Sequence, residues 1–233
     1  KTVMENVGYG LEVQGQKPEE RNKTAMEKIE AVGLTGFEHQ YPNQLSGGMQ
    51  QRVGLARALA TNPSILLMDE AFSALDPLIR SDMQQQLLEL QSELKKTIVF
   101  ITHDLDESLK IGDHIGILNA GKLVQVGRPE EIIMNPADDY VRAFVKDVNR
   151  AKVLRARTVM VSAEKFNGKD VSISNSYKVH EDVYIEEFLP KVLEDRSIIV
   201  VVDKQGNTKG YITEKELAKS LSKTGQDDHK KYT

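Results

Sequence analysis

Apolar residues recur at helical spacing in two segments of the N-terminal part of the chain. Between Glu19 and Val32 they follow the pattern of an amphipathic helix, and Gly33 marks its end. Ser46 has the chemistry of a helix N-cap, and apolar residues at helical spacing follow it through Leu59. These patterns predict two helices joined by a polar loop.

Short apolar runs further along the chain predict strands. Ser64–Met68 and Thr97–Ile101 are continuous runs of the kind that forms strands buried on both faces, and Pro77 begins a helix between them. Ile115–Leu118 and Leu123–Val126 are two more strand-like runs, separated by turn residues. The alternation predicts an α/β fold with a mainly parallel sheet and helices on its faces.

The pattern changes in the last third of the chain. Asp138–Arg157 is expected to be helical, and its mixture of basic and acidic side chains favours a solvated helix face over a contact with anionic lipid. A helix over Asp182–Glu194, a buried strand over Ser197–Val202, a strand over Gly210–Thr213 and a short helix from Glu214 are expected to follow. These elements predict a small α/β module of their own.

Length and composition fit one large domain or two small ones. We divide the 233 residues into domains over 1–150 and 151–222 and a tail over 223–233, which lacks apolar periodicity and is expected to be disordered. The net charge of −4 argues against nucleic acid as a partner, and the absence of cysteine excludes disulfides and thiolate metal sites. Since no apolar run approaches the roughly 20 residues that span a bilayer, these residues are not expected to cross a membrane.

The segment Leu45–Arg52 reads Leu-Ser-Gly-Gly-Met-Gln-Gln-Arg. Two glycines at a helix N-terminus let backbone N–H groups approach an anion closely, and the helix dipole adds to the attraction. Ser-Gly-Gly alone favours a plain helix start, but the whole segment, followed by Ala56–Leu59, resembles the signature motif of ATP-binding cassette (ABC) ATPases. The resemblance implies that this segment binds the ATP molecule held by a partner subunit. The residues implied are Ser46, Gly47, Gly48 and Gln50.

Two acids directly follow the strand-like run Ile65–Met68. Open α/β sheets bind ligands at the carboxyl ends of their strands, although Asp69 and Glu70 alone could equally form a solvated strand end. Their place just before Ser73–Asp76 resembles the Walker B strand and the D-loop of ABC ATPases. That resemblance implies that Asp69 holds Mg²⁺, that Glu70 deprotonates the attacking water, and that Asp76 belongs to a loop crossing a dimer interface onto the nucleotide.

A histidine follows the second predicted strand, in the segment Phe100–Asp104. A lone histidine is more often structural than catalytic. At this spacing after the D-loop, however, His103 resembles the switch histidine of the family, which implies a contact with the γ-phosphate of ATP.

A phosphate-binding G-x-x-x-x-G-K-[ST] loop is absent from residues 1–44. Gly10–Lys17 imitates it, but the lysine is displaced by one position and Pro18 stands where Ser or Thr should bind Mg²⁺. We therefore expect an N-terminally incomplete cassette, whose phosphate loop, adenine-stacking aromatic residue and metal-contacting glutamine precede Lys1. By itself it is expected to bind MgATP very weakly and not to hydrolyse it.

Three further segments resemble a particular group of ABC ATPases, the subunits of glycine betaine, carnitine, choline or proline-betaine importers: Val7–Gly10, Ala71–Arg80 and Asn135–Val141. The resemblance implies a peripheral protein at the cytoplasmic face of the cell membrane, using ATP and Mg²⁺. The implied partners are a second ATP-binding subunit arranged head to tail, transmembrane permease subunits, and an extracellular or periplasmic substrate-binding protein. Solute recognition would belong to the other subunits, because this chain has no tryptophan and 6% aromatic residues.

The C-terminal module resembles a cystathionine-β-synthase (CBS) domain in the segments Val200–Asp203 and Gly210–Glu216. The resemblance implies that Thr213 contacts phosphate and Glu216 contacts ribose, while a CBS fold without a ligand is the favoured alternative. CBS modules work in pairs, so this one needs a partner from another segment or chain.

Three other functions stay open beside osmoprotectant import. They are import of an amino acid or polyamine, a non-catalytic cassette remnant with a regulatory CBS sensor, and a DNA-acting ABC ATPase, which the acidic charge balance disfavours. Intact Asp69, Glu70 and His103 argue against the remnant.

Overall fold

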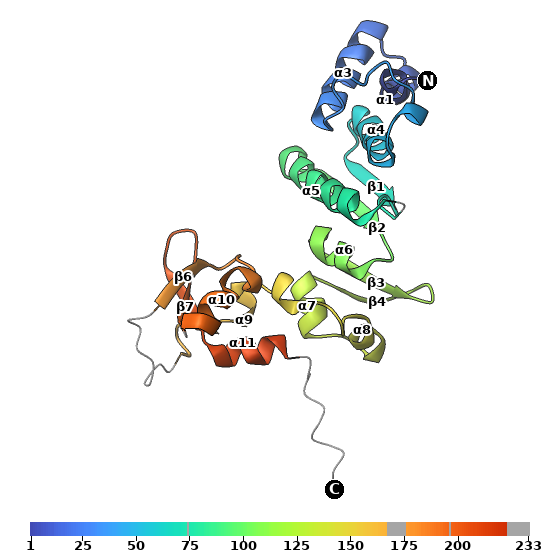
Figure 1. The fold of residues 1–233 in the computed structure, drawn as a ribbon. Coiled ribbons are helices and arrows are strands. Elements are labelled where there is room, and N and C mark those ends of the chain that lie inside the picture. The colour runs from blue at the N-terminus through green and yellow to red at the C-terminus, as the bar shows by residue number, and fades with distance from the viewer. Residues whose placement is uncertain (74, 167–175, 196, 223–233) are drawn as a thin grey trace. The chain divides into compact units, whose positions relative to one another are not determined.

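The computed structural model describes residues 1–73, 75–166, 176–195 and 197–222, and the predicted disordered tail lies outside these residues. The chain forms two compact units, Lys1–Asp104 and Leu105–Thr233 (Figure 1). The predicted boundary at residue 150 stays a prediction, as does the CBS-like identity of the C-terminal module. Within the described ranges, no helix is both long enough and apolar enough to cross a bilayer.

The first unit begins with a helical part. Its helices are α1 (Val3–Val7), α2 (Tyr9–Val13), α3 (Pro18–Ala31), the 3₁₀ turn η1 (Pro42–Gln44) and α4 (Gly47–Ala60). Buried apolar side chains on α1, α3 and α4 hold these helices together, including Val7, Ile29 and Val53. Both helices that the apolar spacing predicts are confirmed, and the chain leaves α3 through Gly33, whose φ of +67° suits glycine.

The two strands of the first unit pair in parallel, as the sequence predicts. They are β1 (Ile65–Asp69) and β2 (Thr97–Ile101), and helix α5 (Pro77–Leu94) connects them. The prediction that these strands are buried on both faces is wrong. Leu66 is 7% exposed on one face, whereas Leu67 is 75% exposed on the other, because no described residue covers that second face.

The second unit starts with α6 (Leu105–Ile111) and a β-hairpin. Strands β3 (Ile115–Asn119) and β4 (Lys122–Gly127) are antiparallel, so parallel pairing does not extend to them. Ala120 and Gly121 both have positive φ, at +48° and +76°, which is the geometry of a two-residue hairpin turn. Helices α7 (Pro129–Met134) and α8 (Asp139–Phe144) follow the hairpin.

The remaining elements form a four-stranded sheet with helices. They are η2 (Arg150–Lys152), α9 (Ala156–Val159), β5 (Val161–Ser162), β6 (Ser176–His180), α10 (Ile185–Asp195), β7 (Ile198–Val202), β8 (Thr208–Ile212) and α11 (Glu214–Leu221). The strand order is β5-β8-β7-β6, with the predicted buried strand β7 at the centre. One apolar cluster includes residues of α7, α8 and this sheet, such as Ile132, Val141 and Ile199.

The prediction of a continuous helix over Asp138–Arg157 is wrong. Helix α8 ends at Phe144, the Asn149 side chain caps a new short turn by accepting a hydrogen bond from the Ala151 N–H at 3.2 Å, and Arg155 is extended. Some of its basic side chains also make internal contacts instead of facing solvent. Arg150 donates to the carbonyl oxygens of Ser220 and Ser222 at 3.2 and 3.0 Å.

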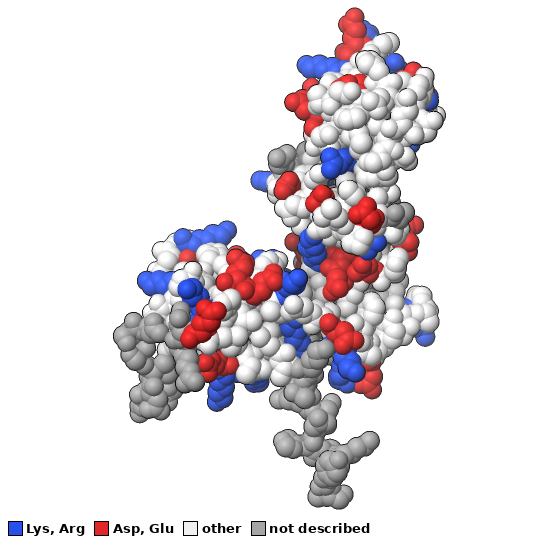
Figure 2. Space-filling model, in the orientation of Figure 1, with Lys and Arg blue, Asp and Glu red and all other residues white. Residues whose placement is uncertain are grey.

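The charged side chains of the second unit are of both signs over its visible surface (Figure 2). This mixture agrees with the sequence, in which acidic residues accompany the basic ones.

Candidate functional site

The signature segment forms the start of helix α4. Ser46 is the N-cap, and its Oγ accepts a hydrogen bond from the Met49 N–H at 3.3 Å. Gln50 donates from Nε2 to the Leu45 carbonyl at 3.2 Å, which ties the first turn to the segment before it. Gly47 is exposed, so the backbone at this helix start is open to a ligand.

Gly48 is buried where α4 meets α5. A Cβ atom at this position would lie 2.6 Å from Cγ2 of Ile79, which is closer than van der Waals contact allows. The Ile79 Cγ2 sits directly on a branched Cβ and cannot swing away easily. Close packing of the two helices therefore requires glycine here, independently of any role in nucleotide binding.

The Gly48→Ala variant is expected to lower the free energy of unfolding by about 1 to 2 kcal/mol, because the overlap with Ile79 outweighs the better helix propensity of alanine. Urea denaturation followed by circular dichroism measures this change. Gly47→Ala is the matched control, since its Cβ would lie 3.8 Å from Leu75, an ordinary contact. Equal midpoints for the two variants would contradict the packing argument.

The acids predicted to act in catalysis stand at the carboxyl end of β1. Asp69 is the last strand residue and pairs in register with Ile101, and the Glu70 N–H donates to the Ile101 carbonyl at 2.9 Å. The strand thus places Glu70 beside the segment that follows β2. There Oε1 of Glu70 lies 3.0 Å from Nδ1 of His103, with both side chains substantially exposed.

Glu70 has an unusual backbone conformation. Its φ is +45°, in the left-handed region that costs a non-glycine residue about 1 to 2 kcal/mol. Ser73 secures the turn, because its N–H and Oγ both donate to the Glu70 carbonyl, at 3.2 and 3.0 Å. The chain therefore turns sharply after β1, and the Glu70 carboxylate reaches His103.

Asp76 caps helix α5. Its Oδ1 accepts hydrogen bonds from the N–H groups of Leu78 and Ile79, both at 3.1 Å. Ala74, which belongs to the same predicted D-loop, lies outside the described residues. Asp76 thus stabilises the start of α5 as its N-cap, and its predicted nucleotide-binding role stays a prediction.

The structure brings Glu70 and His103 together but leaves the signature residues in local contacts. Among the described residues, no group of three or more histidine or acidic side chains is placed to hold a metal ion. Asp69 offers an exposed carboxylate, a hard oxygen donor of the kind Mg²⁺ prefers. The donor chemistry at this strand end therefore fits Mg²⁺.

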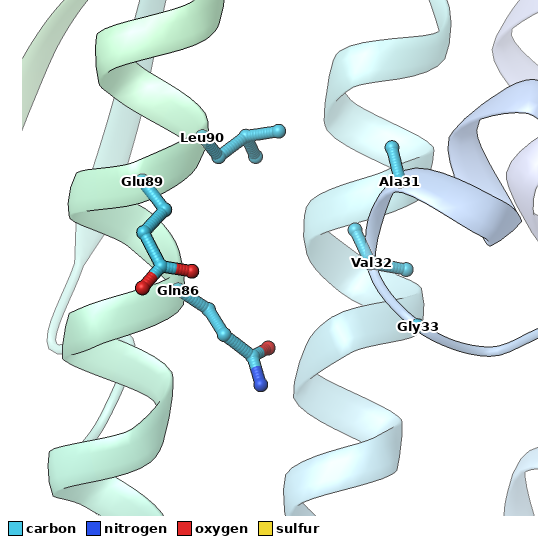
Figure 3. A pocket seen from close by; sticks show the side chains of 6 residues that line it. All are labelled: Ala31, Val32, Gly33, Gln86, Glu89 and Leu90. Atoms are coloured by element: carbon cyan, nitrogen blue, oxygen red, sulfur yellow. The ribbon is translucent and has the colours of Figure 1, made fainter.

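A shallow cavity of about 150 Å³ lies between the end of α3 and α5 (Figure 3). Its lining consists of Ala31, Val32, Gly33, Gln86, Glu89 and Leu90. None of the predicted site residues lines this cavity.

In the C-terminal module, Thr213 and Glu216 bond to each other. Thr213 is the N-cap of α11, its Oγ1 accepts from the Lys215 N–H at 3.3 Å, and the Glu216 carboxylate accepts from the Thr213 N–H and hydroxyl. This arrangement is a capping box, which explains both residues without a ligand.

Two residues with notable contacts were not predicted as important from the sequence. Arg80 contacts the carbonyl oxygens of Ser73 and Leu75 and the carboxylate of Asp104, and Glu130 contacts two arginines, Arg155 and Arg157. The Arg80–Asp104 and Arg157–Glu130 contacts join residues more than twenty positions apart, and no local pattern in the sequence indicates such pairs.

Comparisons with known proteins show which sequences and folds this chain resembles. The sequence pattern of the family described as ABC transporter matches residues 1–73. The chain is 29% identical to cbiO1 from Clostridium perfringens, described as part of the ABC transporter complex cbiONQ. That structural match has a TM-score of 0.53 and covers 62% of this chain and 57% of the other. Residues 1–73 thus match the ABC transporter family, and the predicted α/β cassette fold is confirmed.

Within this family, the chain is similar to glycine betaine transport proteins. It is 64% identical over 167 residues to the glycine betaine/carnitine transport ATP-binding protein GbuA of Listeria monocytogenes, covering 72% of this chain and 42% of that protein. It is 62% identical over 164 residues to the glycine betaine transport ATP-binding protein OpuAA of Bacillus subtilis, covering 70% and 39%. The chain thus spans about two fifths of the length of these relatives.

Proposed function

We propose that this chain is part of an ATP-binding subunit that energises import of a quaternary ammonium osmoprotectant, such as glycine betaine, carnitine, choline or proline betaine. The observation that carries the proposal is the 3.0 Å contact between Glu70 and His103 at the carboxyl end of β1. The transport functions named for the two glycine betaine relatives support the choice of solute.

Glu70 is suited to act as the general base. A carboxylate at a strand end can accept a proton from a water held beside it, and general base catalysis contributes about 10² to 10⁴ in rate. With a proton on each ring nitrogen, His103 could donate from Nδ1 to the Glu70 carboxylate and from Nε2 to a γ-phosphate oxygen. Mg²⁺ bound at Asp69 would offset phosphate charge.

The remaining roles concern other subunits. The backbone at Ser46, Gly47 and Gly48 would bind ATP held by a second ATP-binding subunit in a head-to-tail dimer. Permease subunits and a substrate-binding protein would complete the importer, with this protein at the cytoplasmic face of the membrane.

The proposal is tested with the full-length subunit assembled with its permease in lipid vesicles that contain the substrate-binding protein. Hydrolysis of ATP is measured with glycine betaine, carnitine, choline, proline betaine, a neutral amino acid or a polyamine. Stimulation by one or more of the four quaternary ammonium compounds is expected. Stimulation by the amino acid or polyamine alone would assign another solute, and no hydrolysis in any condition would favour a regulatory protein.

A further inference from the structure

Arg80 links two loops of the candidate site. It lies in the first turn of α5, and its Nη2 donates to the carbonyl oxygens of Ser73 and Leu75 at 3.3 and 3.1 Å. Its Nη1 lies 3.5 Å from Oδ2 of Asp104, the residue that follows His103. One guanidinium thus joins the loop after β1 to the loop after β2.

These contacts close a ring around the catalytic pair. Ser73 donates to the Glu70 carbonyl, and Arg80 connects the Ser73 carbonyl to Asp104. His103 precedes Asp104 in the chain and contacts the Glu70 carboxylate. A change at Arg80 therefore reaches Glu70 from its backbone side and His103 through its neighbour.

We propose that Arg80 is a positioning residue that sets the spacing between the Glu70 turn and the His103 loop, and so holds the two catalytic groups in contact. The proposed effect on hydrolysis depends on the proposed function, whereas the structural link does not. Arg80 acts through Ser73, Leu75 and Asp104, and touches neither Glu70 nor His103 itself within the described contacts.

The shape of the arginine side chain is essential to this role. A guanidinium is planar and directs its two terminal nitrogens in fixed, different directions, which lets Arg80 serve carbonyls on one side and a carboxylate on the other. Lysine carries the same charge on one nitrogen and cannot reproduce this bridge. Arg80→Lys therefore removes the geometry while keeping the charge.

The structural half of the test is amide hydrogen exchange in the full-length subunit. Arg80→Lys is expected to speed exchange of the Leu75 and Asp104 amides about tenfold, because both loops lose a hydrogen-bonded anchor. Arg21→Lys is the matched control, since Arg21 pairs with Glu12 at 3.7 Å away from these loops. Unchanged exchange at Leu75 and Asp104 would overturn the proposal.

The functional half is steady-state ATP hydrolysis by the assembled transporter. Arg80→Lys is expected to lower kcat about tenfold with little change in KM for MgATP, since misplaced groups slow the chemical step without weakening binding. Asp104→Asn should also lower kcat, and the double variant should lower kcat by less than the product of the two single effects.

Faster exchange with an unchanged kcat would overturn the positioning role, and independent effects of the two substitutions would overturn the link through Asp104. A wild-type transporter without hydrolysis would refute the proposed function instead, and the exchange rates would still decide the structural link.

Discussion

Replacing Glu70 with glutamine is expected to lower ATP hydrolysis by the full-length subunit about 10² to 10⁴-fold, because glutamine cannot accept the proton of the attacking water. The amide keeps the size of the carboxylate and can still bond to Nδ1 of His103, so the fold of this turn is expected to persist. Binding of MgATP should remain within about twofold of wild type. Single-turnover hydrolysis and equilibrium nucleotide binding measure the two effects separately.

The control for Glu70→Gln is Glu89→Gln, which makes the same chemical change on the exposed face of α5. Its hydrolysis rate should equal that of the wild type. A Glu70→Gln rate within tenfold of the wild type, roughly 1.4 kcal/mol in barrier height, would contradict the general-base role.

The 233 residues alone should hydrolyse ATP only at background, with or without the substitution. Steady hydrolysis that Glu70→Gln abolishes would refute that expectation.

Features of this structure that depend on neighbouring residues in the sequence could be predicted. Ser46 caps α4 as expected, because an N-cap needs only a hydroxyl and the next three residues. The apolar runs at β1 and β7 form strands, because strand formation follows local pattern and side-chain type. The apolar run before Asp69 was enough to predict that Glu70 stands at the end of a strand.

Features that depend on distant residues could not be predicted. The exposed face of Leu67 depends on what packs against β1, and the sequence of the strand does not contain that information. The left-handed turn at Glu70 is stabilised by Ser73 and by pairing with β2, although glutamate itself disfavours it. The contacts of Arg80 likewise require the final arrangement of two loops.

Replacing Glu130 with glutamine is expected to destabilise the second unit by about 3 kcal/mol, because it leaves two arginines facing each other without their shared counter-charge. The Glu130 side chain is only 10% exposed, and its Oε1 lies 3.5 Å from Nε of Arg155 and 3.4 Å from Nη2 of Arg157. Both arginines are fixed by other contacts, Arg155 to the Tyr184 hydroxyl at 2.8 Å and Arg157 to Asp182, so they cannot easily move apart. Urea denaturation of the wild type and the variant measures the loss.

Asp139→Asn provides the matched control, because Asp139 also pairs with an arginine, Arg142, but its side chain is 96% exposed. Solvent screens such a pair, and its loss should cost less than about 0.5 kcal/mol. Added salt should remove the small effect at Asp139 and leave most of the effect at Glu130, since buried charges are screened far less. Equal destabilisation by the two substitutions would mean that Glu130 contributes no more than a surface pair. A large, salt-resistant loss at Glu130 alone would establish that this carboxylate holds α7 to the N-terminal end of α9.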